Sequence, residues 1–170
     1  LSPPVLKDAG FLAACDWLVR QMRNAHGLEV KLRTNSEAEP HNDTLRTLLF
    51  QALRELLLNV IKHAEVRAVE VTIDLDVEDR IEVVVQDAGK GFDAANYNNR
   101  ALRQTDSCLG LFSLRERVVA LGGDCHIESE PGQGTLVRLA LDRGLASASR
   151  SIASIVTMSR ATPLIPSTIV

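Results

Sequence analysis

Three polar side chains on one predicted helix are the first candidates for chemistry. Glu55, Asn59 and His63 are spaced i, i+4 and i+8, so a helix stacks them along one flank of its apolar stripe. Asparagine is a poor helix former, whereas its amide oxygen is a hard ligand suited to Mg²⁺. Glu55 could polarise a water or a hydroxyl, and Lys62 and His63 could meet a phosphate. The alternative is a solvated polar face, and this helix alone favours that alternative.

A second candidate is the turn D-A-G-K-G-F at residues 87–92, which directly follows a predicted strand. A carboxylate at a strand end, here Asp87, can accept a hydrogen bond from an exocyclic amine. Gly89 and Gly91 allow backbone conformations with positive φ and a close approach to a ligand. The alternative is a tight turn that needs its glycines for geometry only.

A third candidate is Gly110, which stands in L-G-L just before a predicted helix. The first N–H groups of a helix point outward at the positive end of its dipole, so Gly110 and Leu111 could bind an anion. The run G-Q-G-T from Gly132 to Thr135 is a related feature. The alternatives are an ordinary helix start and a β-turn in a hairpin.

Hydrophobic periodicity predicts the elements that position these residues. Helices are predicted over 12–22, 45–64 and 111–121, and strands over 28–32, 69–75, 81–85, 125–129 and 135–141. Gly27 is placed to end the first helix, one of Asn42, Asp43 or Thr44 could cap the second, and Pro3-Pro4 predicts an extended opening. Two hairpin turns are too short for a crossover, which disfavours a parallel Rossmann sheet. We expect an α+β fold, a two-layer sandwich of a mixed β-sheet covered on one face by helices.

Length and composition limit the classes of function. The 170 residues suffice for one domain with an appendage. The net charge of −3 argues against a nucleic-acid-coating or polybasic membrane-surface protein, and 4% aromatic residues are too few for a base-stacking platform. Three widely spaced cysteines form no disulfide framework or zinc motif, and no spanning segment or signal peptide is apparent. We therefore expect a cytoplasmic protein or the cytoplasmic part of a membrane-anchored one. We divide the chain into an opening segment with the first helix and strand (1–39), a core (40–143), and a Ser/Thr-rich tail of unassigned role (144–170).

The candidate features occur together in one known order. The N box matches residues 55–64, the G1 box 87–92, the G2 box 109–111 and the last glycine box 132–135. From about residue 40 to 142 the chain therefore resembles the catalytic, ATP-binding domain of sensor histidine kinases, within the class that includes gyrase, the ninety-kilodalton heat-shock chaperones and the mismatch-repair ATPases. The run L-R-E-R-V at 114–118 and the opening at 1–6 resemble the nitrate-sensor-like subfamily.

The resemblance implies a Bergerat-type ATP-binding fold, ATP and Mg²⁺ as cofactors, and a role for each candidate residue. Asn59 would coordinate the Mg²⁺, and Glu55 would hold a water of the metal shell or assist the reaction. Asp87 would bind the adenine amine, and Thr135 would support the adenine end of the site. The remaining assignments are Gly89 and Gly91 at the wall near the base, residues 93–107 as the lid, and Lys62, His63, Gly110 and Leu111 at the phosphates.

Two departures from the family pattern matter. The G2 box normally has a glycine two residues before Gly110, where this chain has Cys108, and a side chain there could restrict the lid or weaken phosphate binding. None of the four histidines fits the phosphoacceptor pattern, so we expect the acceptor on a dimerisation domain upstream of Leu1. The chain by itself is then not expected to autophosphorylate.

The resemblance thus predicts a protein histidine kinase module that donates the γ-phosphoryl of Mg-ATP to a histidine on that dimerisation domain, for relay to a response regulator. No nucleic-acid partner and no direct membrane contact are expected. One alternative keeps the fold and makes the protein a serine kinase of the anti-sigma-factor type. Another, suggested by Cys108, is a degenerate nucleotide-binding interaction module.

Overall fold

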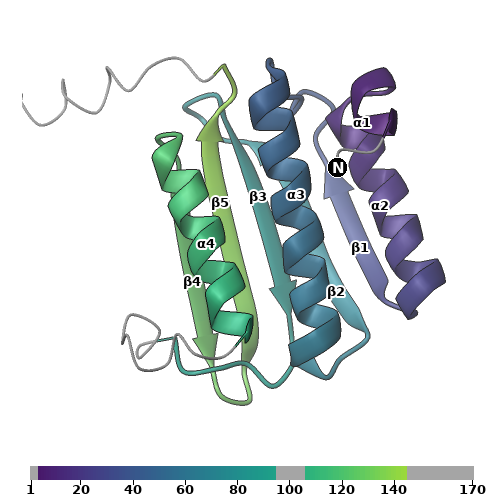
Figure 1. Cartoon of the computed structure of the whole chain (residues 1–170), viewed down its shortest axis with the longest axis vertical. Coiled ribbons are helices and arrows are strands. Elements are labelled where there is room, and N and C mark those ends of the chain that lie inside the picture. Colours follow the sequence, from purple (N-terminus) through teal and green to yellow (C-terminus); the bar gives the residue numbers. More distant parts are fainter. Residues whose placement is uncertain (1–3, 95–105, 145–170) are drawn as a thin grey trace, which may run out of the picture.

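The computed structural model describes residues 4–94 and 106–144, which form a layer of helices packed on a layer of strands (Figure 1). The helices are α1 (Pro4–Asp8), α2 (Phe11–His26), α3 (Asp43–Asn59), the π-helical turn η1 (Val60–Ala64) and α4 (Asp106–Ala120). The strands are β1 (Glu29–Thr34), β2 (Ala68–Leu75), β3 (Arg80–Asp87), β4 (Asp124–Glu130) and β5 (Gly134–Asp142). Within the described residues, no helix has the length and apolar character needed to cross a membrane.

The strands form one mixed sheet in the order β1-β2-β3-β5-β4. Strands β1 and β2 are parallel because the chain between them crosses over through α3, whereas the other neighbours are antiparallel. The pairs β2–β3 and β4–β5 are the two hairpins that the sequence predicts. The expected mixed sheet with helices on one face is therefore confirmed.

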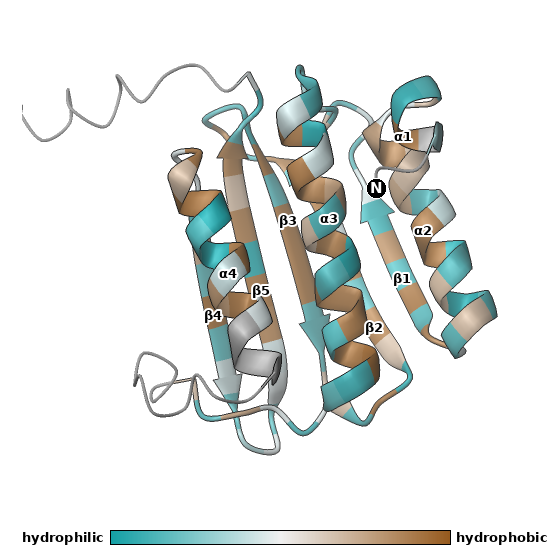
Figure 2. Ribbon diagram, in the orientation of Figure 1, coloured by the Kyte–Doolittle hydropathy of each residue, from teal (hydrophilic) through white to brown (hydrophobic). Residues whose placement is uncertain are grey.

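The core lies between the helices and one face of the sheet (Figures 1 and 2). Along β2, Val69, Val71 and Ile73 are buried while Glu70 and Asp74 are exposed, as strand alternation requires. The stripe on α3 is buried as well, with Leu45, Leu49, Leu53 and Leu57 fully covered. The opposite face of the sheet carries cross-strand ion pairs, which are Lys31–Glu70, Arg80–Asp124 and Arg138–Glu82.

Local chemistry fixes where two helices begin or end. Gly27 ends α2 in the left-handed conformation, with φ of 65°, as predicted. Of the three candidate caps for α3, Asn42 is the one used, because its side-chain oxygen accepts a hydrogen bond from the Leu45 N–H at 2.8 Å.

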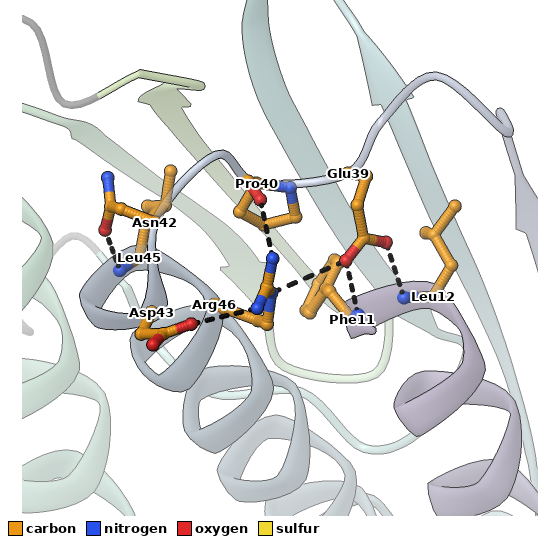
Figure 3. A network of polar contacts seen from close by, with 8 residues as sticks. All are labelled: Phe11, Leu12, Glu39, Pro40, Asn42, Asp43, Leu45 and Arg46. Atoms are coloured by element: carbon orange, nitrogen blue, oxygen red, sulfur yellow. Dashed lines mark hydrogen bonds and ion pairs between the residues drawn. The ribbon is translucent and has the colours of Figure 1, made fainter. Parts of the chain in front are cut away.

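The start of α2 is capped from a distant part of the chain (Figure 3). The carboxylate of Glu39 accepts hydrogen bonds from the backbone N–H groups of Phe11 at 2.5 Å and Leu12 at 3.1 Å. Arg46, near the start of α3, lies 3.5 Å from the same carboxylate and also pairs with Asp43. Glu39 therefore ties the segment before α3 to the start of α2.

Three details differ from the sequence-based expectations. Pro4–Asp8 is a short helix rather than an extended opening, since proline suits the first position of a helix and Leu6 is buried. The long second helix ends in a π-helical turn, η1. Helix α4 begins at Asp106, inside the predicted loop 93–107 and before the predicted start near residue 111. Most of that loop and the 145–170 part of the tail lie outside the described residues.

Candidate functional site

A pocket lies between the C-terminal half of α3, η1 and the adjoining ends of β3 and β5. Its walls are largely apolar, formed by Leu56, Val60, Ala64, Val85, Leu111 and Val137 together with the ring of Phe92. The polar and charged side chains that line it are Asn59, His63, Asp87, Lys90 and Thr135. An apolar cavity with a few convergent polar groups is the usual form of a small-molecule site.

Asp87 is the one buried charged residue among the described residues, with 8% of its surface exposed. It ends β3, where the register puts it opposite Thr135 of β5. Its Oδ1 atom accepts a hydrogen bond from the Gly89 N–H at 2.8 Å. Burial raises the pKa of the Asp87 carboxyl, and hydrogen bonds from the backbone N–H groups of Gly89 and Thr135 offset part of that rise. A buried carboxylate in an apolar pocket is a candidate binding group.

The turn after Asp87 packs tightly between the end of η1 and the turn that joins β4 to β5. A Cβ at Gly89 would lie 2.2 Å from the Ala64 carbonyl oxygen, and one at Gly91 would lie 2.1 Å from that of Glu130. The Lys90 N–H donates to the Ala64 carbonyl at 2.9 Å, and the Lys90 carbonyl accepts from the Gly132 N–H at 2.7 Å. Gly91 also has φ of 59°. The G1 and last glycine boxes are therefore in direct contact, and glycine is needed at 89 and 91 for close packing.

Asn59 is the last residue of α3 and lines the pocket. Its Nδ2 atom is buried and has no hydrogen-bond partner among the described residues. The chain then widens into η1, and single π-turns within helices are frequent at functional sites. His63 lines the pocket with Asn59, whereas Lys62 is exposed and is not among the lining residues.

Glu55 lies outside the pocket lining, one turn before Asn59. Its Oε2 atom is 2.6 Å from a guanidinium nitrogen of Arg117 on α4. Its Oε1 atom is 2.9 Å from the point that a Cβ on Gly110 would occupy. Glu55 therefore faces α4 beside Gly110. Arg117 belongs to the 114–118 run, but the sequence pattern predicts no contact between it and Glu55, because the two residues are 62 positions apart.

The geometry expected at Gly110 is wrong in one respect. Because α4 begins at Asp106, Gly110 and Leu111 lie within the helix and outside the first four positions, whose N–H groups lack helical partners. Glycine is the poorer helix former of the two residues, so Cys108 in place of the family's glycine favours this earlier start. The side chain of Cys108 lies outside the described residues. Leu111 still reaches the pocket wall, where it is buried.

The residues present fit a magnesium ion bound together with phosphates. Where the structure describes the chain, it has no cluster of three or more His, Cys, Asp or Glu side chains that could hold a metal alone. Mg²⁺ commonly keeps several waters and takes only one or two protein ligands beside the phosphates of a substrate. Asn59 lines the pocket, and its side-chain carbonyl oxygen is a hard ligand of the kind that Mg²⁺ takes.

Several lining residues were not assigned by sequence reasoning. Leu56, Val60, Val85 and Val137 belong to stripes that equally predict an ordinary core. Lys90 and Phe92 lie within the G1 box, and their place in the motif was the available signal.

Comparison with known proteins agrees with this geometry. The family model described as histidine kinase-, DNA gyrase B- and HSP90-like ATPase matches residues 44–145. The oxygen sensor histidine kinase NreB of Staphylococcus carnosus (strain TM300) is 32% identical over 139 residues, which are 82% of this chain and 38% of NreB. The chain thus spans well under half the length of this relative.

Two solved structures share the fold. The histidine kinase AdeS of Acinetobacter baumannii superposes with a TM-score of 0.62 at 18% identity, over 79% of this chain and 65% of AdeS. Full-length ShkA in complex with AMPPNP superposes with a TM-score of 0.59 at 24% identity, over 75% of this chain and 29% of ShkA. The chain belongs to the family of histidine kinase-, DNA gyrase B- and HSP90-like ATPases, and it is an ATPase domain of the sensor histidine kinase type.

Proposed function

We propose that the pocket binds Mg-ATP and that the chain donates the γ-phosphoryl group to a histidine on a dimerisation domain, for relay to a response regulator. The observation that carries the nucleotide part is Asp87, a buried carboxylate at the base of an apolar pocket. The structure solved with AMPPNP adds support, since ShkA binds an ATP analogue and shares this fold. The similarity to NreB supports the kinase part.

Three polar residues of the pocket then have a task. Asp87 accepts a hydrogen bond from the adenine amine, while Val85, Val137 and the Phe92 ring bury the base. Asn59 and His63 face the phosphate end, with Asn59 as the metal ligand and Glu55 next to it to hold a metal-bound water. When bound, Mg²⁺ would neutralise charge on the phosphates, which is the main requirement of phosphoryl transfer.

Calorimetric titration with ADP and a non-hydrolysable ATP analogue, with and without Mg²⁺, tests the nucleotide-binding part of this proposal. Asp87→Asn should weaken binding about tenfold, because the acceptor of the hydrogen bond loses its charge. Asn59→Ala should remove the effect of Mg²⁺ and largely spare binding in its absence. Asp74→Asn on the exposed side of β2 is the matched control and should bind as the unmodified chain does.

One feature favours a second candidate, a degenerate nucleotide-binding or interaction module. The helical backbone at Gly110 does not present the N–H groups that the family's G2 box would offer to phosphate. A folded chain that binds neither nucleotide in the titration would support this candidate and exclude the kinase. Binding that depends on Asp87 and Mg²⁺ would exclude a module that has lost its nucleotide site.

A further inference from the structure

Helix α4 reaches across to the N box through one side chain. The Arg117 guanidinium lies 2.6 Å from Glu55 Oε2, and its Nε donates to the Ser113 carbonyl at 3.3 Å. The side chains of Arg117 and Glu55 are 38% and 30% exposed, so both are partly withdrawn from water. The guanidinium is thus held between its own helix and α3, which lie next to each other in Figure 1.

The position of this ion pair indicates a role other than stabilising the fold. Exposed ion pairs contribute little to stability, but this one lies beside Gly110, the residue before Leu111 of the pocket wall. The point where a Cβ of Gly110 would stand is 2.9 Å from Glu55 Oε1 and 4.0 Å from Asn59 Nδ2. The Glu55 carboxylate and the Asn59 amide therefore approach the same point of α4. Arg117 holds one carboxylate oxygen, and this fixes where the other oxygen lies beside Gly110.

We propose that Arg117 is a positioning residue, which orients the Glu55 carboxylate toward the water shell of the Mg²⁺ that Asn59 binds. The inference rests on the proposed function, because it needs a metal at Asn59. Partners one shell beyond a metal ligand orient the groups that the metal uses, and removing them commonly weakens metal binding about 10–100-fold. A guanidinium suits this task because its planar fork holds a carboxylate in a defined orientation.

The measurement is the magnesium-dependent gain in affinity, which is the Kd of the ATP analogue in EDTA divided by its Kd in Mg²⁺. It is determined calorimetrically for the unmodified chain, Arg117→Gln, Arg117→Lys, Glu55→Gln and the double variant Glu55→Gln/Arg117→Gln. Arg115→Gln is the matched control, because it removes the same charge from an exposed position of the same helix. Thermal melts establish that each variant is folded.

We expect Arg117→Gln to reduce the gain about tenfold while changing the Kd in EDTA less than about twofold, and Arg115→Gln to change neither. Arg117→Lys should retain part of the gain. If Arg117→Gln does not fold, Arg117→Lys is the variant that tests the inference. The double variant should be no worse than Glu55→Gln alone, because Arg117 acts only through Glu55. A purely structural role would lower affinity with and without Mg²⁺ alike.

Each contrary result identifies what is wrong. A loss of affinity in EDTA for Arg117→Gln would make Arg117 a direct phosphate contact or a structural residue, and would overturn the inference. An unchanged gain for Arg117→Gln, together with a reduced gain for Glu55→Gln, would overturn it and leave the proposed function standing. No effect of Glu55→Gln would remove the role of Glu55 and the inference with it. No nucleotide binding by the unmodified chain would instead refute the proposed function itself.

Discussion

A single carboxylate, Asp87, shows how the site and the fold make opposite demands on one residue. Its burial raises its pKa, which means that the folded chain disfavours the ionised form. The hydrogen bonds from Gly89 and Thr135 reduce this cost without removing it. Ionised Asp87 therefore makes the ligand-free fold less stable. In the proposed function, the hydrogen bond that Asp87 accepts from the adenine amine offsets this loss of stability.

The pH dependence of stability follows from the direction of this shift. Asp87 ionises more easily in the unfolded chain than in the folded chain, so its ionisation destabilises the fold. This effect is absent at a pH below the ordinary aspartate pKa, where both states are protonated, and it is complete at a pH above the raised pKa of the folded state. We predict that Asp87→Asn melts at a higher temperature than the unmodified chain at pH 7. The difference should shrink as the pH falls through the folded pKa and vanish below the ordinary one. Thermal melts across this pH range measure it.

Asp74→Asn is a control with the opposite sign. A hydrogen bond from Asn35, followed by one from the Leu75 N–H, lowers the pKa of the Asp74 carboxyl. Its ionised form therefore contributes stability above the ordinary aspartate pKa, and this contribution is lost as the pH falls. Asp74→Asn should melt slightly lower at pH 7. A stabilisation by Asp87→Asn that does not depend on pH would contradict the assignment to its ionisation.

At the scale of elements, helix α2 depends on a cap that is remote in sequence. We predict that Glu39→Ala destabilises the fold by about 1–2 kcal/mol, because the N–H groups of Phe11 and Leu12 lose their acceptor at the positive end of the helix dipole. Urea denaturation measures the loss. Glu37→Ala, at an exposed position of the same connection, should change stability by less than about 0.5 kcal/mol. Equal effects of the two variants would show that Glu39 is not a cap.

The elements also show what the sequence could predict. The five strands and three main helices follow from alternation and helical spacing, because burial repeats with the period of the backbone. The π-helical turn could not be predicted from these patterns, because Asn59 and His63 are four positions apart in the sequence whether the backbone is α-helical or π-helical. The contacts Glu39–Phe11 and Arg117–Glu55 could not be predicted either, because contacts between residues far apart in the chain leave no local pattern in the sequence. The start of α4 was missed because the polar residues before Gly110 have no period.

For the candidate site, the motifs identified most of the polar lining but not its apolar walls. Asn59, His63, Asp87, Gly91, Leu111 and Thr135 were all singled out from the sequence, and all line the pocket. Their roles remain predictions. Val85 and Val137 could not be distinguished from core residues, because their place at a cavity depends on where η1 and the glycine turns leave space.

At the scale of the whole molecule, binding in the pocket should stabilise the entire chain. A ligand at 100 times its Kd adds about 2.7 kcal/mol to folding stability, which corresponds to a rise in Tm of about 5–10 °C for a chain of this size. We predict such a rise with the ATP analogue and Mg²⁺, and a smaller rise after removal of Mg²⁺ with EDTA. Thermal melts at increasing ligand concentration measure both. An equal rise for Asp87→Asn would mean that the ligand binds elsewhere.

The pairing of β3 with β5 has a consequence for how the site comes into existence. Asp87 and Val85 belong to the hairpin β2–β3, while Thr135 and Val137 belong to the hairpin β4–β5. Each hairpin closes between neighbours in the chain, but the seam between them joins segments separated by the whole of α4. Contacts of that sequence separation are slow to form. Neither hairpin alone carries more than one wall of the pocket. A ligand that needs both walls should therefore bind the completely folded chain and not a folding intermediate that has only one hairpin.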